Sequence, residues 1–189
     1  SDHVRSGVIP IEPRKQWPSR SPIPKDYRLQ PGRALSRWGD GGWGDVVRTG
    51  KQVESNFDEA LVQASVEFIT NRWRPDPPPE WVTYVPSIRH PNLVAEFSAR
   101  LAESLGLLHV EAIVKTTETD PQKSMENSAH QCTNVKGAFE VDGPLPKGPV
   151  LLVDDVVDSR WTLTVIGTLL LHAYSGPVYP FALASAAVS

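Results

Sequence analysis

The stretch "VLLVDDVVDSRWTLT", from Val150 to Thr164, constrains the fold of this chain more than any other. It begins with apolar residues typical of a buried strand, reaches Asp154 and Asp155, and then leads into a polar turn before an apolar helix. In an open parallel sheet, ligands bind outside the carboxyl ends of the strands, where the loops leave room. The stretch therefore predicts a strand that delivers two carboxylates to a site, followed by a helix whose first turn lies beside them.

Strands and helices alternate along the rest of the sequence. Apolar residues at helical or strand spacing, bounded by proline and glycine, predict the following elements: helix 54–73, strand 81–86, helix 91–106, strand 109–115, a strand at 150–155, a helix from about 163 to 176 and strand 178–183. Such alternation favours an α/β fold with a parallel sheet flanked by helices. The long polar interval 116–148 breaks the rhythm, which is typical of a functional or disordered loop.

Charge divides the chain into two parts. Residues 1–50 carry nine Lys or Arg and five Asp or Glu, whereas residues 51–189 carry ten and seventeen, so the net charges are +4 and −7. Six prolines fall between Pro10 and Pro31, so we interpret residues 1–50 as a basic arm, either a connector or a wrapping segment, and residues 51–189 as the α/β domain.

Composition excludes several classes of protein. With 40% hydrophobic residues the chain can form a real core, and its single cysteine rules out an internal disulfide framework. No apolar run approaches the roughly 20 residues that cross a bilayer, and no segment resembles a secretory signal. We expect no membrane partner and a cytoplasmic location.

The chemistry of the 150–164 stretch fits a phosphorylated sugar. Adjacent strand residues point to opposite faces of a sheet. Asp154 and Asp155 therefore suit the two hydroxyls of a ribose, or one hydroxyl and a hydrated magnesium ion. The unpaired amides at the start of the next helix, with Ser159 and Thr162, form an anion site. Two other interpretations stay open: acids after a strand also occur in response-regulator and dehydrogenase-like folds, and the turn can simply cap a helix.

The same stretch resembles the phosphoribosyl pyrophosphate motif of type I phosphoribosyltransferases, and the element order from about residue 54 to 184 is similar to that fold. The resemblance implies that Asp154 and Asp155 bind the ribose hydroxyls, with Mg²⁺ held there directly or through water. It places Asp158 at a base or leaving-group contact, as the catalytic candidate if the domain is active. The remaining implied ligand contacts are the 5-phosphate loop Ser159, Arg160, Trp161 and Thr162, and Ser87 and Arg89 of a pyrophosphate loop. The interval 116–148 would be a mobile flap.

The motif departs from the family at two positions. Members commonly carry glycine where this chain has Arg160 and Trp161, because the backbone must approach the phosphate closely. We expect Arg160 to supply a charge-assisted contact to the phosphate, and Trp161 either to point away from it or to form a wall.

A second resemblance covers nearly the whole chain. The segments 11–18, 31–44, 127–139 and 154–165 look like the carboxyl-terminal region of bacterial RecQ-like ATP-dependent DNA helicases that carry a phosphoribosyltransferase-like domain. The resemblance implies an accessory domain joined to a helicase core, with DNA or another 5-phosphorylated nucleic acid as partner. The GxxxxGK[ST] phosphate loop of an ATPase motor is not in this sequence.

In that context the basic arm can bind nucleic acid. Its cations can follow a phosphate backbone while Trp17, Trp38 and Trp43 stack on bases. The alternative is that these tryptophans pack on the domain itself. Three functions therefore remain: a repair-helicase module that binds a ribose 5-phosphate-type ligand, an active magnesium-dependent phosphoribosyltransferase, or a docking domain that has lost its ligand.

Overall fold

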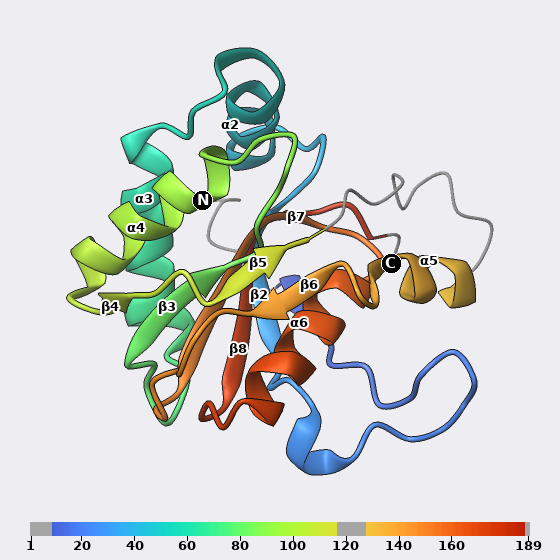
Figure 1. The fold of residues 1–189 in the computed structure, drawn as a ribbon. Coiled ribbons are helices and arrows are strands. Elements are labelled where there is room, and N and C mark those ends of the chain that lie inside the picture. Colours follow the sequence, from blue (N-terminus) through green and yellow to red (C-terminus); the bar gives the residue numbers. More distant parts are fainter. Residues whose placement is uncertain (1–8, 117–127, 188–189) are drawn as a thin grey trace.

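The computed structural model describes residues 9–116 and 128–187 as an α/β fold built on one six-stranded sheet (Figure 1). The sheet order is β1-β2-β8-β7-β3-β4, and all neighbouring strands are parallel except β1 and β2. The six strands are β1 (Ile9–Ile11), β2 (Gly32–Arg37), β8 (Val178–Ser185), β7 (Val150–Val157), β3 (Trp81–Tyr84) and β4 (Leu108–His109). The predicted α/β class, with a mostly parallel sheet flanked by helices, is confirmed.

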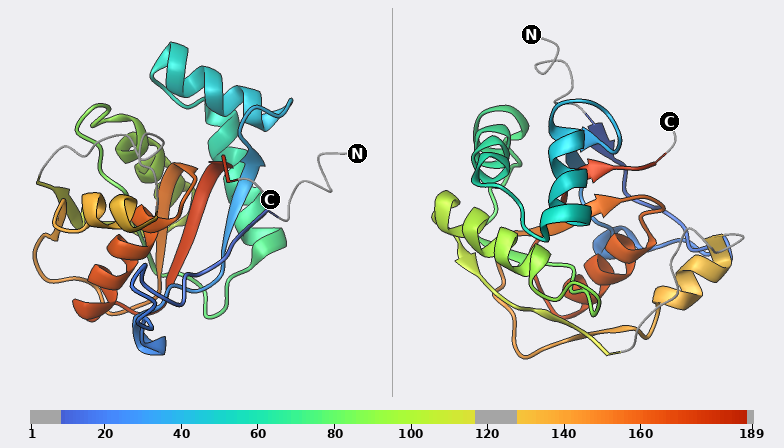
Figure 2. Two further views of the ribbon diagram at one scale, coloured as in Figure 1. Left: turned by 90° about the vertical axis from the view of Figure 1, so that its right-hand side faces the viewer. Right: turned by 90° about the horizontal axis from the view of Figure 1, so that it is seen from above.

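Helices cover both faces of this sheet, as Figure 1 and the turned views of Figure 2 show. One face is covered by α2 (Trp43–Thr49), α3 (Glu59–Glu67) and α4 (Leu93–Leu105). The other is covered by α6 (Trp161–His172), α5 (Ser128–Val135) and a small antiparallel sheet of β5 (Ile113–Lys115) and β6 (Phe139–Val141). The remaining elements are a 3₁₀-helix, η1 (Lys25–Tyr27), and two π-helices, η2 (Gly50–Glu54) and η3 (Phe68–Trp73).

Strand β7 shows why the sequence folds this way. Leu151 and Val153 are buried against α2, α3 and α4, whereas Val150 and Leu152 are buried on the α6 side. Because successive strand residues point to opposite faces, a strand covered on both faces must be apolar at every position. Burial of each such side chain contributes about 1.5–3 kcal/mol. The continuous apolar run is therefore the signature of a central strand.

The described part of the basic arm is built into the domain. Its strand β2 pairs in parallel with β8, and β1 pairs with β2, so the arm supplies one edge of the sheet. Ile23 and Leu29 are buried as well, and Leu29 contacts Gly167 of α6. The described residues of the arm therefore pack into the sheet and the core, and the interpretation of residues 1–50 as a connector or a wrapping segment stays a prediction. The boundary that we placed after residue 50 stays a prediction.

Several predicted elements differ in detail. Helix 54–73 is α3, capped by the Asp58 side chain, and continues as the wider turns of η3. Strand 109–115 is two strands, β4 and β5, which belong to different sheets. Interval 116–148 contains α5 and β6, and residues 117–127, the centre of the expected flap, lie outside the described residues. In the two described ranges, no helix has the length and apolar character to span a membrane.

The order of the strands marks one place for a ligand. From β3 the chain crosses through α4 to β4, and from β7 it crosses through α6 to β8 in the opposite direction along the sheet. The strand order therefore reverses between β3 and β7. Ligands of open α/β sheets bind at such a switch point, outside the carboxyl ends of the strands.

Candidate functional site

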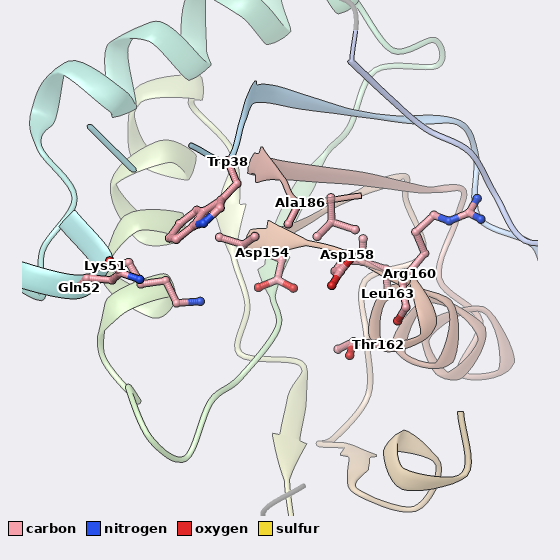
Figure 3. A pocket seen from close by; sticks show the side chains of 12 residues that line it. Trp38, Lys51, Gln52, Asp154, Asp158, Arg160, Thr162, Leu163 and Ala186 are labelled. Atoms are coloured by element: carbon pink, nitrogen blue, oxygen red, sulfur yellow. The ribbon is translucent and has the colours of Figure 1, made fainter. Parts of the chain in front are cut away.

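A cavity of about 400 Å³ opens beside the carboxyl end of β7 (Figure 3). A second, of about 190 Å³, adjoins it toward β3, and Lys51, Asp154 and Thr162 line both. The structure thus brings together the predicted acids and the predicted turn. The further residues that line the larger cavity are Trp38, Gln52, Val156, Val157, Asp158, Ser159, Arg160, Leu163 and Ala186.

The two aspartates lie inside strand β7, and not at its end as we predicted. The strand continues to Val157 because β8 continues beside it to Ser185. On the other side, however, β3 ends at Tyr84, opposite Val153. Asp154 and Asp155 therefore come after the last residue of β7 that pairs with β3, although they still lie beside β8. The smaller cavity lies where β3 no longer pairs with β7.

Each carboxylate folds back onto the next backbone amide. The amide N–H of Asp155 donates to Oδ1 of Asp154 over 2.8 Å, and the N–H of Val156 donates to Oδ1 of Asp155 over 2.7 Å. Both residues line the smaller cavity although they follow one another in a strand. The pair can thus offer oxygen atoms to two neighbouring hydroxyls of one ligand.

The charges of the site are unequal. Nζ of Lys51, in η2, lies 2.9 Å from Oδ2 of Asp155 and forms an ion pair with it. Burial and the negative charge of Asp155 raise the pKa of Asp154 well above its ordinary value, and Lys51 only partly opposes this rise. Asp154 therefore holds a proton more readily than an ordinary aspartate does, and a cation bound nearby would restore its charge.

The turn after β7 has the backbone of a glycine turn without the glycine. Arg160 has φ 74°, in the left-handed region that costs a non-glycine residue about 1–2 kcal/mol. Its guanidinium donates to the carbonyl of Glu12 over 2.7 Å, and its own carbonyl accepts the hydroxyl of Thr164 over 2.7 Å. These contacts hold the conformation, and α6 begins at Trp161, two residues earlier than predicted.

The side chain of Trp161 points away from the cavity into the core. It is 1% exposed and stacks on Trp17 of the arm at 6.3 Å between ring centres. Its indole N–H is buried with no acceptor among the described residues, which costs about 1–3 kcal/mol. Of our two expectations for Trp161, pointing away is right, so the large ring does not block the loop that we assigned to the phosphate.

The loop after β3 contributes one of its two predicted residues. Ser87 lines the smaller cavity with the acids, and its Oγ accepts the backbone N–H of His90 over 3.1 Å. Arg89 lines neither the smaller nor the larger cavity. Asp158 is exposed and lies at the mouth of the larger cavity. The roles that we assigned to these residues stay predictions.

Several residues that line the larger cavity were not predicted as part of this site, and three of them come from the amino-terminal side of the chain. Trp38, Lys51 and Gln52 form the wall opposite the turn, as Figure 3 shows. Trp38 follows β2, and Lys51 and Gln52 belong to η2, whose wide turns are frequent at functional sites. No local pattern marks Lys51 in the sequence, because only the packing of η2 beside β7 brings its charge to the acids.

The acid pair fits a magnesium ion only together with a ligand. Within residues 9–116 and 128–187, no three His, Cys, Asp or Glu side chains gather at metal-binding distance. Mg²⁺ commonly binds one or two carboxylates and completes its shell with water and substrate phosphates. Asp154 and Asp155 suit that role, in which the ligand supplies the remaining oxygen atoms and the cation offsets the repulsion that raises the pKa of Asp154.

The outer side of the turn forms another cavity, of about 410 Å³, that shares Asp158, Ser159 and Arg160 with the first. Arg14 and Arg37 add positive charge there, and Glu12 lies beside them. Burial and the charge of Arg160 lower the pKa of Arg14 to about 10. Cations are therefore crowded around the turn, which favours an anion near it.

Comparisons with known proteins found similarity in structure alone. No protein-family model matches the chain, and no curated protein matches it. The adenine phosphoribosyltransferase of Leishmania donovani is 18% identical over 72% of this chain and 56% of that one, with a TM-score of 0.45. That of Leishmania tarentolae is 14% identical over 92% of this chain and 83% of that one, with a TM-score of 0.44. The match thus spans little more than half of the first structure.

Proposed function

We propose that the chain binds a ligand containing a ribose 5-phosphate group at the end of β7. The observation that carries this proposal is the joint lining of one cavity by Asp154 and by the turn residues Ser159, Arg160 and Thr162. A carboxylate accepts hydrogen bonds from the hydroxyl groups of a sugar, and the amino-terminal end of a helix attracts a phosphate. The two groups lie side by side, as the two ends of a ribose 5-phosphate require.

The reaction that such a site supports best is magnesium-dependent phosphoribosyl transfer. The bond from C1 of the ribose to pyrophosphate breaks, the pyrophosphate leaves with the electron pair, and a nucleophile forms the new bond to C1. Asp154 and Asp155 would hold the hydroxyls of the positively charged ribose, and Ser87 would contact the leaving group. Mg²⁺ would supply charge neutralisation to the pyrophosphate, held at the acid pair.

Titration of the chain with phosphoribosyl pyrophosphate, ribose 5-phosphate and ribose tests the ligand class. We expect binding of the two phosphorylated ligands and none of ribose. Asp155→Asn and Thr162→Val should each weaken binding roughly 10- to 150-fold, the loss of a charged hydrogen bond of about 1.5–3 kcal/mol. Asp26→Asn and Thr70→Val are matched controls on the exposed surface. Equal affinity for ribose and ribose 5-phosphate would overturn the proposal.

Release of pyrophosphate tests the reaction separately. Incubation with phosphoribosyl pyrophosphate, Mg²⁺ and each nucleobase in turn should release pyrophosphate with one of them, and Asp154→Asn should abolish the release. Binding of phosphoribosyl pyrophosphate without release, whichever base is offered, would leave a binding module and exclude the transferase among these bases.

The second candidate is a module of a DNA repair helicase that binds a 5-phosphorylated strand end. The cavity on the outer side of the turn favours it, because Arg14, Arg37 and Arg160 extend the positive charge beyond one phosphate. Against it, Trp17, Trp38 and Trp43 lie against the domain's two hydrophobic cores, so their rings are partly engaged already. A helicase core and DNA remain proposed partners.

Oligonucleotides with and without a 5-phosphate separate this candidate from the transferase. The strand-end proposal requires tighter binding of the phosphorylated oligonucleotide and a loss of that preference in Thr162→Val. Equal affinity for both oligonucleotides, together with binding of free ribose 5-phosphate, would exclude the strand end and retain the ligand class.

A further inference from the structure

We propose that Arg14 and Trp17 of the arm are positioning residues for the 159–162 turn, holding the backbone N–H of Arg160 toward the cavity. This inference rests on the proposed binding of a phosphorylated ligand at that turn. Arg14 and Trp17 are far from the turn in sequence and do not line the 400 Å³ cavity. They act from the outer side of the turn.

Arg14 grips the turn through two kinds of contact. Its Nε donates to the carbonyl oxygen of Ser159 over 3.0 Å, and its Nη2 donates to the same oxygen. Its guanidinium carbon lies 3.8 Å from the centre of the Trp161 ring, so the planar group covers the indole. One side chain of the arm therefore contacts both the residue before Arg160 and the residue after it.

Trp17 is the second residue of the arm that contacts the Trp161 indole. Its ring lies nearly parallel to Trp161, with an angle of 15° between their planes, and Nζ of Lys136 lies 4.2 Å from the centre of the Trp17 ring. Lys136 follows α5 directly, and α5 packs beside α6. The turn is thus supported through two indoles and two cations from three separate segments.

The direction of these contacts decides which way the turn faces. A trans peptide group is planar, so its C=O and N–H point in opposite directions. Because Arg14 binds the carbonyl of Ser159 from the outer cavity, the N–H of Arg160 is directed away from Arg14. Rotation of this peptide group would break both hydrogen bonds that Arg14 donates to the Ser159 carbonyl. The arm therefore fixes the amide that a phosphate at the turn would meet.

Hydrogen exchange and ligand titration on the full chain test this role together. We expect Arg14→Ala to increase amide exchange at residues 159–162 without ligand and to weaken ribose 5-phosphate binding at least tenfold. Arg14→Lys keeps the charge but cannot cover the indole with a planar group, so it should recover only part of the affinity. Lys15→Ala, an exposed change of the same charge in the same arm, should alter neither measurement.

Trp17→Leu provides a second route that leaves every charge in place. It should remove the exciton signal of the stacked indoles from the circular dichroism spectrum, and it should weaken the binding of ribose 5-phosphate as Arg14→Ala does. The inference is overturned by unchanged exchange at 159–162 in Arg14→Ala, or by exchange that increases equally over the whole chain. Failure of the parent chain to bind ribose 5-phosphate would instead refute the proposed function, since the exchange comparison needs no ligand.

Discussion

The ion pair between Lys51 and Asp155 offers the sharpest test of the site's electrostatics. We predict that Lys51→Met destabilises the folded chain, although the change removes only one charge from a half-buried position. Lys51 lies 2.9 Å from Asp155, and Asp155 in turn raises the pKa of Asp154. Without the lysine, two neighbouring carboxylates lose their nearest countercharge.

The magnitude follows from burial. A hydrogen bond between charged groups contributes about 1.5–3 kcal/mol, and exposed pairs contribute less. The Asp155 side chain is 12% exposed and that of Lys51 is 32% exposed, so we expect the lower part of that range, about 1.5–2 kcal/mol. In a chain of this size, such a loss lowers the melting temperature by roughly 3–8 °C.

A double-mutant cycle isolates the pair. Lys51→Met, Asp155→Asn and the double variant are unfolded in urea, and their free energies of unfolding are compared with that of the parent. We expect Asp155→Asn to cost less than Lys51→Met, because it also removes the repulsion on Asp154. A coupling energy of at least 1 kcal/mol supports the reasoning. A value below about 0.5 kcal/mol, as for independent sites, would refute it.

Three further predictions follow from other contacts. Burial and the charge of Asp155 raise the pKa of Asp154, so the folded chain keeps a proton that the unfolded chain has lost. The stability of the folded chain therefore falls as pH rises from about 4 through that raised pKa. Urea unfolding of Asp154→Asn between pH 4 and 7 should lack this decline. Gly167→Ala should destabilise the chain by about 1–3 kcal/mol in a thermal melt, although alanine normally favours a helix, because its Cβ would lie 2.3 Å from Cδ1 of Leu29. Thr164→Ala should cost about 0.5–1.5 kcal/mol by the same assay, since the Thr164 hydroxyl donates to the Arg160 carbonyl over 2.7 Å.

The sequence predicted the central elements because their local and tertiary signals agree. The apolar run at Val150–Val153 is buried on both faces, and the apolar stripe of α4 is followed by Gly106 in the left-handed conformation. The sequence did not predict a strand whose position depends only on the strand that pairs with it. Strand β2 reads as part of a proline-rich arm, and only its pairing with β8 makes it an edge of the sheet.

The same distinction separates the site residues. Asp154, Asp155 and the turn are continuous in sequence, so one motif marked them all. Lys51 reaches Asp155 from a segment about a hundred residues away, and no spacing rule connects the two. Long-range contacts of this kind depend on how η2 packs beside β7, which composition and periodicity do not encode.

The unusual turn and the basic arm explain one another. Arginine in a left-handed conformation and an indole N–H with no acceptor in residues 9–116 and 128–187 both destabilise the turn, and a glycine-rich loop would avoid both costs. In this chain, Glu12 accepts the Arg160 guanidinium, while Trp17 stacks on the buried indole. These contacts come from the segment that also forms the edge of the sheet. Glycine would adopt the left-handed backbone of this turn without help, whereas Arg160 adopts it with support from contacts of the arm. The departure from glycine therefore does not argue against a phosphate at the turn.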